Sequence, residues 1–562
     1  MEPTLTMSKI DKEDVSKHRF KIGFGSTDKR DKKQTKTQKA KENKPPKKKK
    51  SDQKKEMQIE RPSVAFSELP LEAKVIETYE ITPPFSRVDI ASIPELGGGY
   101  AYYINEVTLS ENEQAIRLKL VDILSKELKL PAKGVDTKTH ISNEAHRIAK
   151  KYGLQKRIEE SSWPAIEYCL HRDLVGFGDI DVIMKDPLIE DLSVNGVNLP
   201  VFIWHRKYES LPTNLIFTDE NALDNLIVKL THLSGKHISS AFPILDAMLP
   251  GKDRLAATYK REVSPKGGSF SIRRFREEPF SIIDLIEMGT INEEIAAYFW
   301  LLIENRMSIA VIGGTGAGKT STLNALASLV KPSMKIVTVE EIPEMNLPHI
   351  NWVQLVSRES YGLGTFKTGE VTLYDLVKTS LRYRPDYIVV GEIRGEEAFV
   401  LFQALATGHG GLTTLHAENL AYSIKRLTSR PMNVAEAYIP LLNVAPLIER
   451  VRLRNALGGT TFGRRIKSLI EIIDYEKYQT ISQWDPLTDS FTVDLPNSFL
   501  LKKIAKSQAL TLSDVLSEAQ NRQNFLHDLR VKGLRNNKEL AKEITNYYAK
   551  LDHLGVYKNE AQ

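Results

Sequence analysis

Apolar residues recur at helical spacing in four stretches of the first half of the chain. These stretches predict helices over about residues 111–128, 141–152, 162–171 and 221–235. Between residues 176 and 275, short apolar runs separated by turn residues predict strands instead, with a hairpin over 202–217. Helices and strands that do not alternate regularly predict a mixed α+β domain in this half of the chain.

From residue 281 onward the pattern changes to a regular alternation. Two helices are predicted over 281–304, and Thr290 and Glu293 have the spacing of a capping box for the second. Short apolar runs then predict strands over 308–312, 335–339, 387–390 and 412–415, with helices over 320–329, 374–383 and 396–407. This order predicts a parallel sheet flanked by helices, hence an α/β fold. Strand-like pieces over 469–475 and 491–493 precede further helices.

These patterns divide the 562 residues into four segments. We expect a tail over 1–60, an N-terminal α+β domain over 61–280, a nucleotide-binding core over 281–475 and a mostly helical extension over 476–562.

The one cysteine, Cys169, excludes an intrachain disulfide framework and a Cys-only zinc site. No run approaches the roughly 20 apolar residues that span a bilayer, and the start lacks the apolar core of a signal peptide. We therefore expect a cytoplasmic protein, peripheral to the membrane.

The basic charge is concentrated in the tail. Residues 1–56 hold 19 Lys/Arg and 9 Asp/Glu, a net of +10, whereas the chain as a whole carries +6. The tail is poor in apolar residues, so we expect it to be disordered. Two interpretations stay open: a solvated extension, and an electrostatic tether to anionic lipid or nucleic acid.

Residues 313–320 match the phosphate-binding pattern G-x-x-x-x-G-K-[ST] between a predicted strand and a predicted helix. The backbone N–H groups of such a loop and the helix N-terminus bind the phosphates of a nucleotide. Lys319 is expected to reach the β- and γ-phosphates, and the Thr320 hydroxyl to bind Mg²⁺. The predicted ATP and Mg²⁺ site contains Gly313, Gly314, Thr315, Gly316, Ala317, Gly318, Lys319, Thr320 and Ser321.

Acidic residues follow two of the predicted parallel strands. Glu392 comes after the apolar run 387–390, where a carboxylate can hold Mg²⁺ through water. Glu340, Glu341 and Glu344 come after the run 335–339. The carboxyl ends of parallel strands converge on the ligand, so one of these acids should orient or deprotonate the attacking water.

Two histidines and several arginines are further candidates. His409 and His416 flank the run 412–415, where they could sense phosphate or serve as structural hydrogen bonders. Phosphoryl transfer needs positive charge at the γ-phosphate, often from another domain or subunit. The arginines considered are Arg254, Arg273, Arg274, Arg276, Arg358, Arg382, Arg384 and Arg394.

Taken together, the four elements 313–320, 340–344, 391–394 and 407–416 resemble the Walker A, Asp box, Walker B and His box of the type II/type IV secretion ATPase superfamily. The stretches 190–196, 205–208 and 234–239 resemble its archaeal branch, which contains archaellum motor ATPases and GspE/PilB-like pilus ATPases. Glu341 stands where relatives often have Asp, and Gly395 follows Arg394 where Asp is usual. The tetracysteine zinc element of the bacterial secretion members is absent, and the basic tail is outside the shared pattern.

The resemblance implies a RecA-like domain in a homo-hexameric ring, with ATP between it and the N-terminal domain. It implies Glu344 as catalytic base, Glu392 as Walker B acid, and His409 and His416 as His-box residues. It further implies Arg254 and Arg273 as phosphate contacts and Arg358 and Arg382 as candidate arginine fingers. The implied partners are a polytopic inner-membrane platform protein and a pilin- or archaellin-like filament.

Two alternatives remain. A nucleic-acid-translocating or DNA-transfer ATPase would also use the phosphate loop and the basic tail, but residues 57–562 have a net charge of −4, which disfavours nucleic acid as a partner. A non-catalytic nucleotide-binding scaffold would not need Lys319, Glu344 and Glu392 together.

Overall fold

The computed structural model describes residues 64–94, 99–129, 134–276, 278–358, 369–454 and 460–553. The predicted basic tail lies outside the described residues. The described residues form two sheets.

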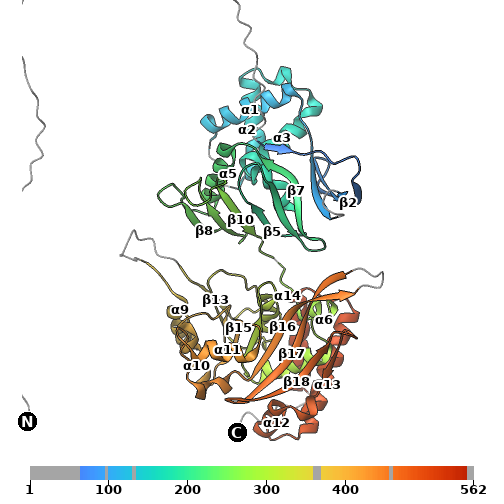
Figure 1. Cartoon of the computed structure of the whole chain (residues 1–562), viewed down its shortest axis with the longest axis vertical. Coiled ribbons are helices and arrows are strands. Elements are labelled where there is room, and N and C mark those ends of the chain that lie inside the picture. Colours follow the sequence, from blue (N-terminus) through green and yellow to red (C-terminus); the bar gives the residue numbers. More distant parts are fainter. Residues whose placement is uncertain are drawn as a thin grey trace, which may run out of the picture. The chain divides into compact units, whose positions relative to one another are not determined.

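The first sheet has ten strands in the order β2-β3-β4-β7-β6-β5-β10-β9-β8, with β1 paired to β7 (Figure 1). Its strands are β1 Val64–Phe66, β2 Lys74–Thr82, β3 Ser86–Ser92, β4 Tyr100–Glu106, β5 Ile189–Val194, β6 Pro200–His205, β7 Glu209–Phe217, β8 Ile244–Met248, β9 Arg254–Thr258 and β10 Ser269–Arg273. The predicted hairpin is confirmed, because β6 and β7 pair antiparallel. The sheet β2-β3-β4 was not predicted, since its strands alternate only partly between buried and exposed positions.

All four predicted helices of this half are confirmed, with small shifts in their ends. They are α1 Glu111–Glu127, α2 Thr137–Lys151, α3 Trp163–Leu174 and α5 Glu220–Leu233, and a short α4 Asp181–Lys185 lies between α3 and β5. The second helix begins earlier than its apolar spacing indicates, because the Asp136 side chain accepts the N–H of Thr139 and caps it. The first three helices share one apolar core, which includes Leu120, Ile148 and Ile166.

The second sheet has nine strands in the order β13-β12-β14-β15-β11-β16-β17-β18-β19. Strands β13 to β16 run parallel and β16 to β19 antiparallel. The strands are β11 Ile309–Gly313, β12 Ile336–Glu340, β13 Trp352–Val356, β14 Tyr387–Val390, β15 Gly410–His416, β16 Val444–Arg454, β17 Thr460–Asp474, β18 Lys477–Asp485 and β19 Ser490–Val493. The predicted α/β class with a parallel sheet is confirmed.

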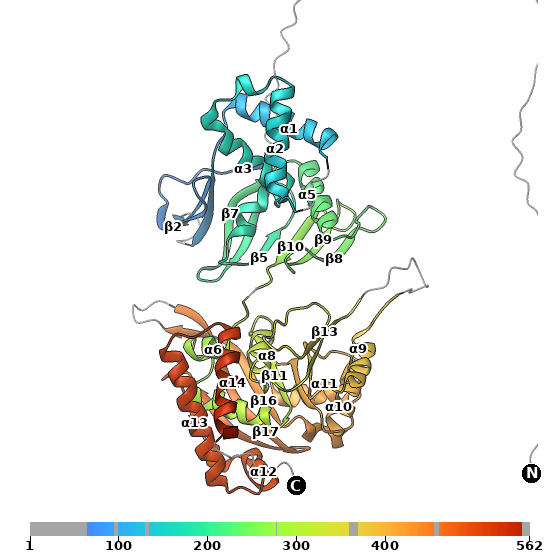
Figure 2. The same ribbon diagram turned by 180° about the vertical axis from the view of Figure 1, so that it is seen from behind.

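Helices cover both faces of this second sheet. One face packs against α6 Ile282–Glu287, α7 Glu293–Glu304, α8 Lys319–Ala327, α12 Phe499–Ser507, α13 Leu512–Val531 and α14 Asn537–His553. The other packs against α9 Leu373–Ser380, α10 Glu397–Ala406 and α11 Leu420–Thr428. Figure 2 views the side that carries α8, α13 and α14. The parallel strands are buried on both sides, which explains their nearly continuous apolar runs.

The predicted capping box at Thr290 and Glu293 is wrong. Helix α7 starts at Glu293, and the Asn292 side chain caps it by accepting the N–H of Ile295 at 2.9 Å. Thr290 is buried before the helix, and its carbonyl accepts the N–H of Ile466 of β17 at 3.0 Å. A tertiary contact with β17 thus holds Thr290 away from the cap position.

The last helices are attached to α7 by a buried ion pair among aromatic rings. Arg522 of α13 is fully buried, and its guanidinium binds the carboxylates of Glu304 and Glu518. It also lies 4.8 Å from the ring centroid of Trp300, whose Nε1 donates to the hydroxyl of Tyr548 at 2.9 Å. A buried charge needs such partners, so these contacts fix α13 and α14 against the core of the second sheet.

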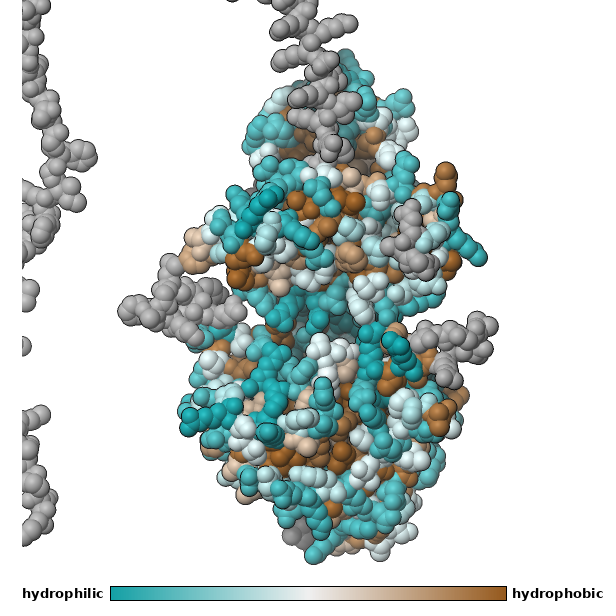
Figure 3. All heavy atoms as spheres, in the orientation of Figure 1, coloured by the Kyte–Doolittle hydropathy of each residue, from teal (hydrophilic) through white to brown (hydrophobic). Residues whose placement is uncertain are grey.

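Figure 3 shows hydrophilic and apolar side chains intermingled on the visible face. Within the described ranges, none of the helices combines the length and the apolar character that a bilayer span requires.

Candidate functional site

The phosphate loop connects β11 directly to α8, as its flanking patterns predict. Gly316 and Gly318 have φ of +69° and +94°, in the left-handed region that glycine tolerates best. Gly313 is needed for space, because a Cβ there would lie 2.5 Å from the carbonyl oxygen of Ile448 in β16. The loop therefore leads the chain from a buried strand into a helix whose first turn starts at Lys319 and Thr320.

Lys319 lies inside the loop and interacts electrostatically with one acidic residue, Glu392. Its Nζ donates to the carbonyl oxygen of Gly314 at 2.9 Å. Burial lowers the pKa of the Lys319 ammonium, whereas the nearby Glu392 carboxylate opposes this shift and Arg394 adds to it. The tertiary fold thus brings Glu392 within electrostatic range of Lys319.

Glu392 follows β14, which is separated from β11 by β15. It is ion-paired with Arg394 at 2.6 Å, and the same guanidinium reaches Glu341 at 3.5 Å. The turn is held by the buried carboxylate of Glu397, which accepts the N–H groups of Arg394 at 2.6 Å and Gly395 at 2.7 Å. Gly395 stands where Asp is usual, so this position supplies no carboxylate here. A Cβ at this position would lie 2.9 Å from the Glu397 carboxylate.

The acidic turn after β12 starts three strands away from β11, roughly 14 Å at the usual strand spacing. The segment turns back toward the phosphate loop, because the N–H of Asn346 donates to the Asn324 side chain of α8 at 3.1 Å. Met345 is fully buried in the core that also contains α8, whereas the adjacent Glu344 is exposed. Glu344 is therefore an accessible carboxylate on a turn fixed beside the phosphate-loop helix.

The structure separates the two predicted histidines. His416 is the last residue of β15 and pairs in register with Gly313 of β11, so it borders the phosphate loop. His409 precedes the same strand at its other end, where its Nδ1 lies 3.0 Å from the carbonyl oxygen of Ala404 in α10. The six residue steps from Gly410 to His416 span roughly 20 Å, so His409 does not reach the loop of its own chain.

Arg254 and Arg273 are neighbours on the first sheet. They face each other across β9 and β10, and residues paired in this way point to the same side of a sheet. Each has its own acidic partner, Asp246 at 2.6 Å for Arg254 and Asp191 at 3.0 Å for Arg273. Two separated stretches of the sequence thus form one exposed pair of guanidinium groups.

The two candidate arginine fingers lie away from the loop of their own chain. Arg358 follows β13, four strands from β11 and roughly 19 Å away at the usual spacing. Arg382 is exposed before β14, at the edge of the sheet opposite the loop. Neither side chain can reach the phosphate loop of its own chain without a large rearrangement.

Arg464 of β17 is a residue that the sequence patterns did not single out. Its Nε donates to the carbonyl oxygen of Gly316 at 3.4 Å, and its Cδ lies against Gly318. The neighbouring Arg465 is buried and anchors the strand through a bidentate ion pair with Asp489 at 2.7 and 2.8 Å. Only the pairing of β17 with β16 brings Arg464 to the loop, and no local motif marks it.

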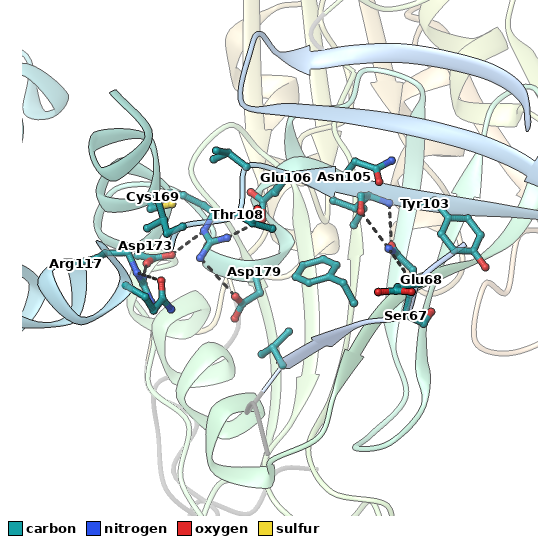
Figure 4. A pocket seen from close by; sticks show the side chains of 18 of the residues that line it. Ser67, Glu68, Tyr103, Asn105, Glu106, Thr108, Arg117, Cys169, Asp173 and Asp179 are labelled. Carbon is teal, nitrogen blue, oxygen red and sulfur yellow. Dashed lines mark hydrogen bonds and ion pairs between the residues drawn. The ribbon is translucent and has the colours of Figure 1, made fainter. Parts of the chain in front are cut away.

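The positions of two cavities can be compared with that of the phosphate loop. A cavity of 580 Å³ borders the phosphate loop and is lined by residues of the loop, of β16 and of the segment just before α11, among them Gly314, Asn419 and Ile448. A larger cavity of 900 Å³ lies in the first half of the chain, where Arg172 forms ion pairs with Glu106 at 2.7 Å and Asp173 at 2.8 Å (Figure 4). Its lining contains none of the predicted nucleotide-binding residues, so the smaller cavity belongs to the candidate site.

The donor set fits Mg²⁺ bound together with a nucleotide. In the described ranges no cluster of three or more His, Cys, Asp or Glu could hold a metal by itself. Thr320 and Glu392 supply a hydroxyl and a carboxylate, which are the oxygen ligands Mg²⁺ prefers. Mg²⁺ commonly completes its coordination shell with phosphate and water, so two protein groups are sufficient.

Glu340 leads to a pH-dependent prediction. It is 3% exposed, and burial raises its pKa to about 7 despite its hydrogen bonds. A carboxyl whose pKa is raised in the folded state binds its proton more tightly when folded, so stability falls as the pH rises from about 4.5 to about 7. Relative to Glu340→Gln, the unfolding free energy of the parent should fall by about 3 kcal/mol over that range. Denaturant titrations from pH 4.5 to 7.5 measure the free energy of unfolding of both proteins. The prediction is contradicted if this free energy changes with pH in the parent as it does in Glu340→Gln.

A family model described as Type II/IV secretion system protein matches residues 187–453. An uncharacterized protein of Methanocaldococcus jannaschii is 38% identical over 399 residues, which cover 69% of each chain. The chain belongs to the type II/IV secretion system protein family. The match includes the phosphate loop, both acidic turns, both histidines and strands β9 and β10. An archaeal relative of this kind is compatible with the archaeal branch of the family.

Two further proteins that are similar to this chain are named as conjugal transfer proteins. A putative conjugal transfer protein of Mycobacterium tuberculosis is 35% identical over 258 residues, covering 44% of this chain and 71% of that protein. Conjugal transfer protein TrbB of Rhizobium radiobacter is 30% identical over 266 residues, covering 46% of this chain and 77% of that protein.

Proposed function

We propose that this chain is an ATPase motor of the type II/IV secretion family that hydrolyses MgATP and drives a pilus, archaellum or related secretion machine. The observation that carries the proposal is the convergence of Lys319, Glu392 and the Glu344 turn on one edge of the second sheet. A phosphate ligand, a Mg²⁺ ligand and a candidate base are the groups that phosphoryl transfer to water needs.

In this proposal each residue has a separate role. The loop amides and Lys319 would bind the phosphates, and Thr320 and Glu392 would hold Mg²⁺. When bound, the ion would supply positive charge next to the phosphates. Glu344 accepts a proton from the attacking water, because it is an exposed carboxylate of the turn fixed against α8. The other exposed carboxylate of this turn, Glu341, lies 3.5 Å from the Arg394 guanidinium. His416 and Arg464 lie beside the loop, so they are placed to respond to the phosphates.

The proposed assembly is a homo-hexamer. Arg358 and Arg382 lie away from their own loop, so an arginine-finger role for them requires a neighbouring subunit. The exposed pair Arg254 and Arg273 would close over the phosphates as the N-terminal domain over 61–280 moves against the core over 281–475. We propose that this motion is passed to a polytopic platform protein of the cytoplasmic membrane and from there to a pilin- or archaellin-like filament.

A DNA-transfer ATPase is the second candidate, because two relatives are named as conjugal transfer proteins. The net charge of −4 over residues 57–562 argues against direct binding of nucleic acid by that part of the chain. The two candidates therefore differ in which polymer or surface stimulates the enzyme.

The test is ATP hydrolysis by the purified full chain with Mg²⁺, alone and with anionic vesicles or with single- or double-stranded DNA. A motor that works at a membrane should hydrolyse ATP, and anionic vesicles should stimulate it more than DNA does. Stimulation by DNA without a response to vesicles would favour the DNA-transfer candidate. Absence of hydrolysis under all conditions, with ATP still bound, would favour a nucleotide-binding scaffold instead.

A further inference from the structure

Glu340, the last residue of β12, accepts three hydrogen bonds from groups inside the protein. Its Oε1 accepts the backbone N–H groups of Glu344 and Met345, both at 2.8 Å. Its Oε2 accepts from the Nε2 of Gln354 in β13 at 2.9 Å. With the side chain 3% exposed, Glu340 cannot reach a water molecule at the phosphates, so it is not itself the base.

The three donors determine the path of the turn that contains Glu344. Two of them are consecutive backbone N–H groups, so the Glu340 carboxylate closes the turn on itself. The Gln354 amide extends this contact, because it also donates to the carbonyl oxygen of Met345 at 3.2 Å. The turn is thereby joined to the neighbouring strand, and Asn346 joins it to α8 on its other side.

Burying a carboxylate is unfavourable, and among the residues that the structure describes no positive side chain is a hydrogen-bond partner of Glu340. Its three partners are the neutral amides of Glu344, Met345 and Gln354. The nearby Glu344 carboxylate further disfavours a second negative charge. A buried carboxylate that lowers stability is expected at a position where it has a functional role. One such role is to hold a reactive group in place.

We propose that Glu340 is a positioning residue, whose carboxylate holds the Glu344 turn so that the Glu344 side chain faces the attacking water. This inference rests on the proposed hydrolysis of ATP and deepens it. A displacement of about 1 Å can cost on the order of 10²-fold in rate. Loss of the Glu340 carboxylate should therefore lower kcat while the phosphate loop still binds nucleotide.

The experiment measures kcat, nucleotide affinity and melting temperature for Glu340→Ala, Glu340→Gln and Gln354→Met in the full chain. Glu340→Ala should lower kcat by about 10²-fold, with the dissociation constant for ATP changed less than about threefold. Glu340→Gln keeps one oxygen for the two N–H groups, so it should lose only part of that rate. Gln354→Met removes one donor and should also have an intermediate effect. Val356→Ala, at the partly exposed end of β13, is the matched control and should behave as the parent.

A double-mutant cycle with Glu344→Gln separates positioning from general destabilisation. If Glu340 acts through Glu344, adding Glu340→Ala to Glu344→Gln should lower kcat by less than about threefold further. Additive losses, a parent-like kcat for Glu340→Ala, or a loss confined to nucleotide affinity would each overturn the inference. A parent-like rate for Glu344→Gln alone would instead contradict the proposed role of Glu344, so the two failures are distinguishable.

Discussion

Replacing Lys319 with alanine should lower ATP hydrolysis by on the order of 10²–10³-fold, the usual cost of removing a preorganised group that stabilises charge in a transition state. Its ammonium lies within the loop, next to the Gly314 carbonyl and in the field of Glu392. Among the described residues, no other lysine lies in the phosphate-loop helix, so this charge has no local substitute.

The fold should survive this substitution, because Lys319 is the first residue of α8 and alanine is a good helix former. Steady-state hydrolysis and melting temperature are compared for the parent, Lys319→Ala and the control Lys425→Ala, which removes an exposed lysine of α11. The proposed function fails if Lys319→Ala hydrolyses ATP as fast as the parent. Equal losses in Lys319→Ala and Lys425→Ala would indicate a general effect of charge.

Glu344→Gln should lower kcat by about 10²–10⁴-fold, the range in which general bases contribute. Glutamine has the same shape but cannot accept the proton of the attacking water at neutral pH. The Glu344 side chain is exposed and its backbone N–H still donates to Glu340, so the turn and the affinity for ATP should be unchanged.

Single-turnover hydrolysis and equilibrium binding of ATP measure the two quantities separately for Glu344→Gln. The control is Glu396→Gln, an exposed carboxylate just before α10, which should behave as the parent. A parent-like kcat in Glu344→Gln, with a large loss in Glu392→Gln, would move the role of base to Glu392.

Local patterns were sufficient for the elements that depend on neighbours in sequence. The phosphate loop requires glycines where φ is positive and a strand and a helix on either side, and all of these are contiguous along the chain. Strand β14 is a pure apolar run because both its faces are buried. Strand β16, which is paired with both β11 and β17, was missed because residues such as Glu449 and Arg450 interrupt its apolar pattern.

Local patterns could not predict which other residues lie beside the phosphate loop. His409 and His416 are seven positions apart and looked alike, yet an extended strand places them at opposite edges of the sheet. Arg464 reaches the loop only through the pairing of β17 with β16, which is a contact between distant residues. The predicted capping box failed for a similar reason, since β17 holds Thr290 away from the helix.

By itself the sequence determined the α/β class, the nucleotide-binding loop with Lys319, and acidic residues at the ends of two strands, because these depend on short-range spacing and burial. Only the tertiary structure decided that Glu340 is buried and Glu344 exposed. The order of the strands places β12 three positions from β11, and the hydrogen bonds of Asn346 and Glu340 bring its turn back toward α8. Such contacts join residues separated by many positions, so their geometry follows from packing of the whole sheet and not from any local pattern.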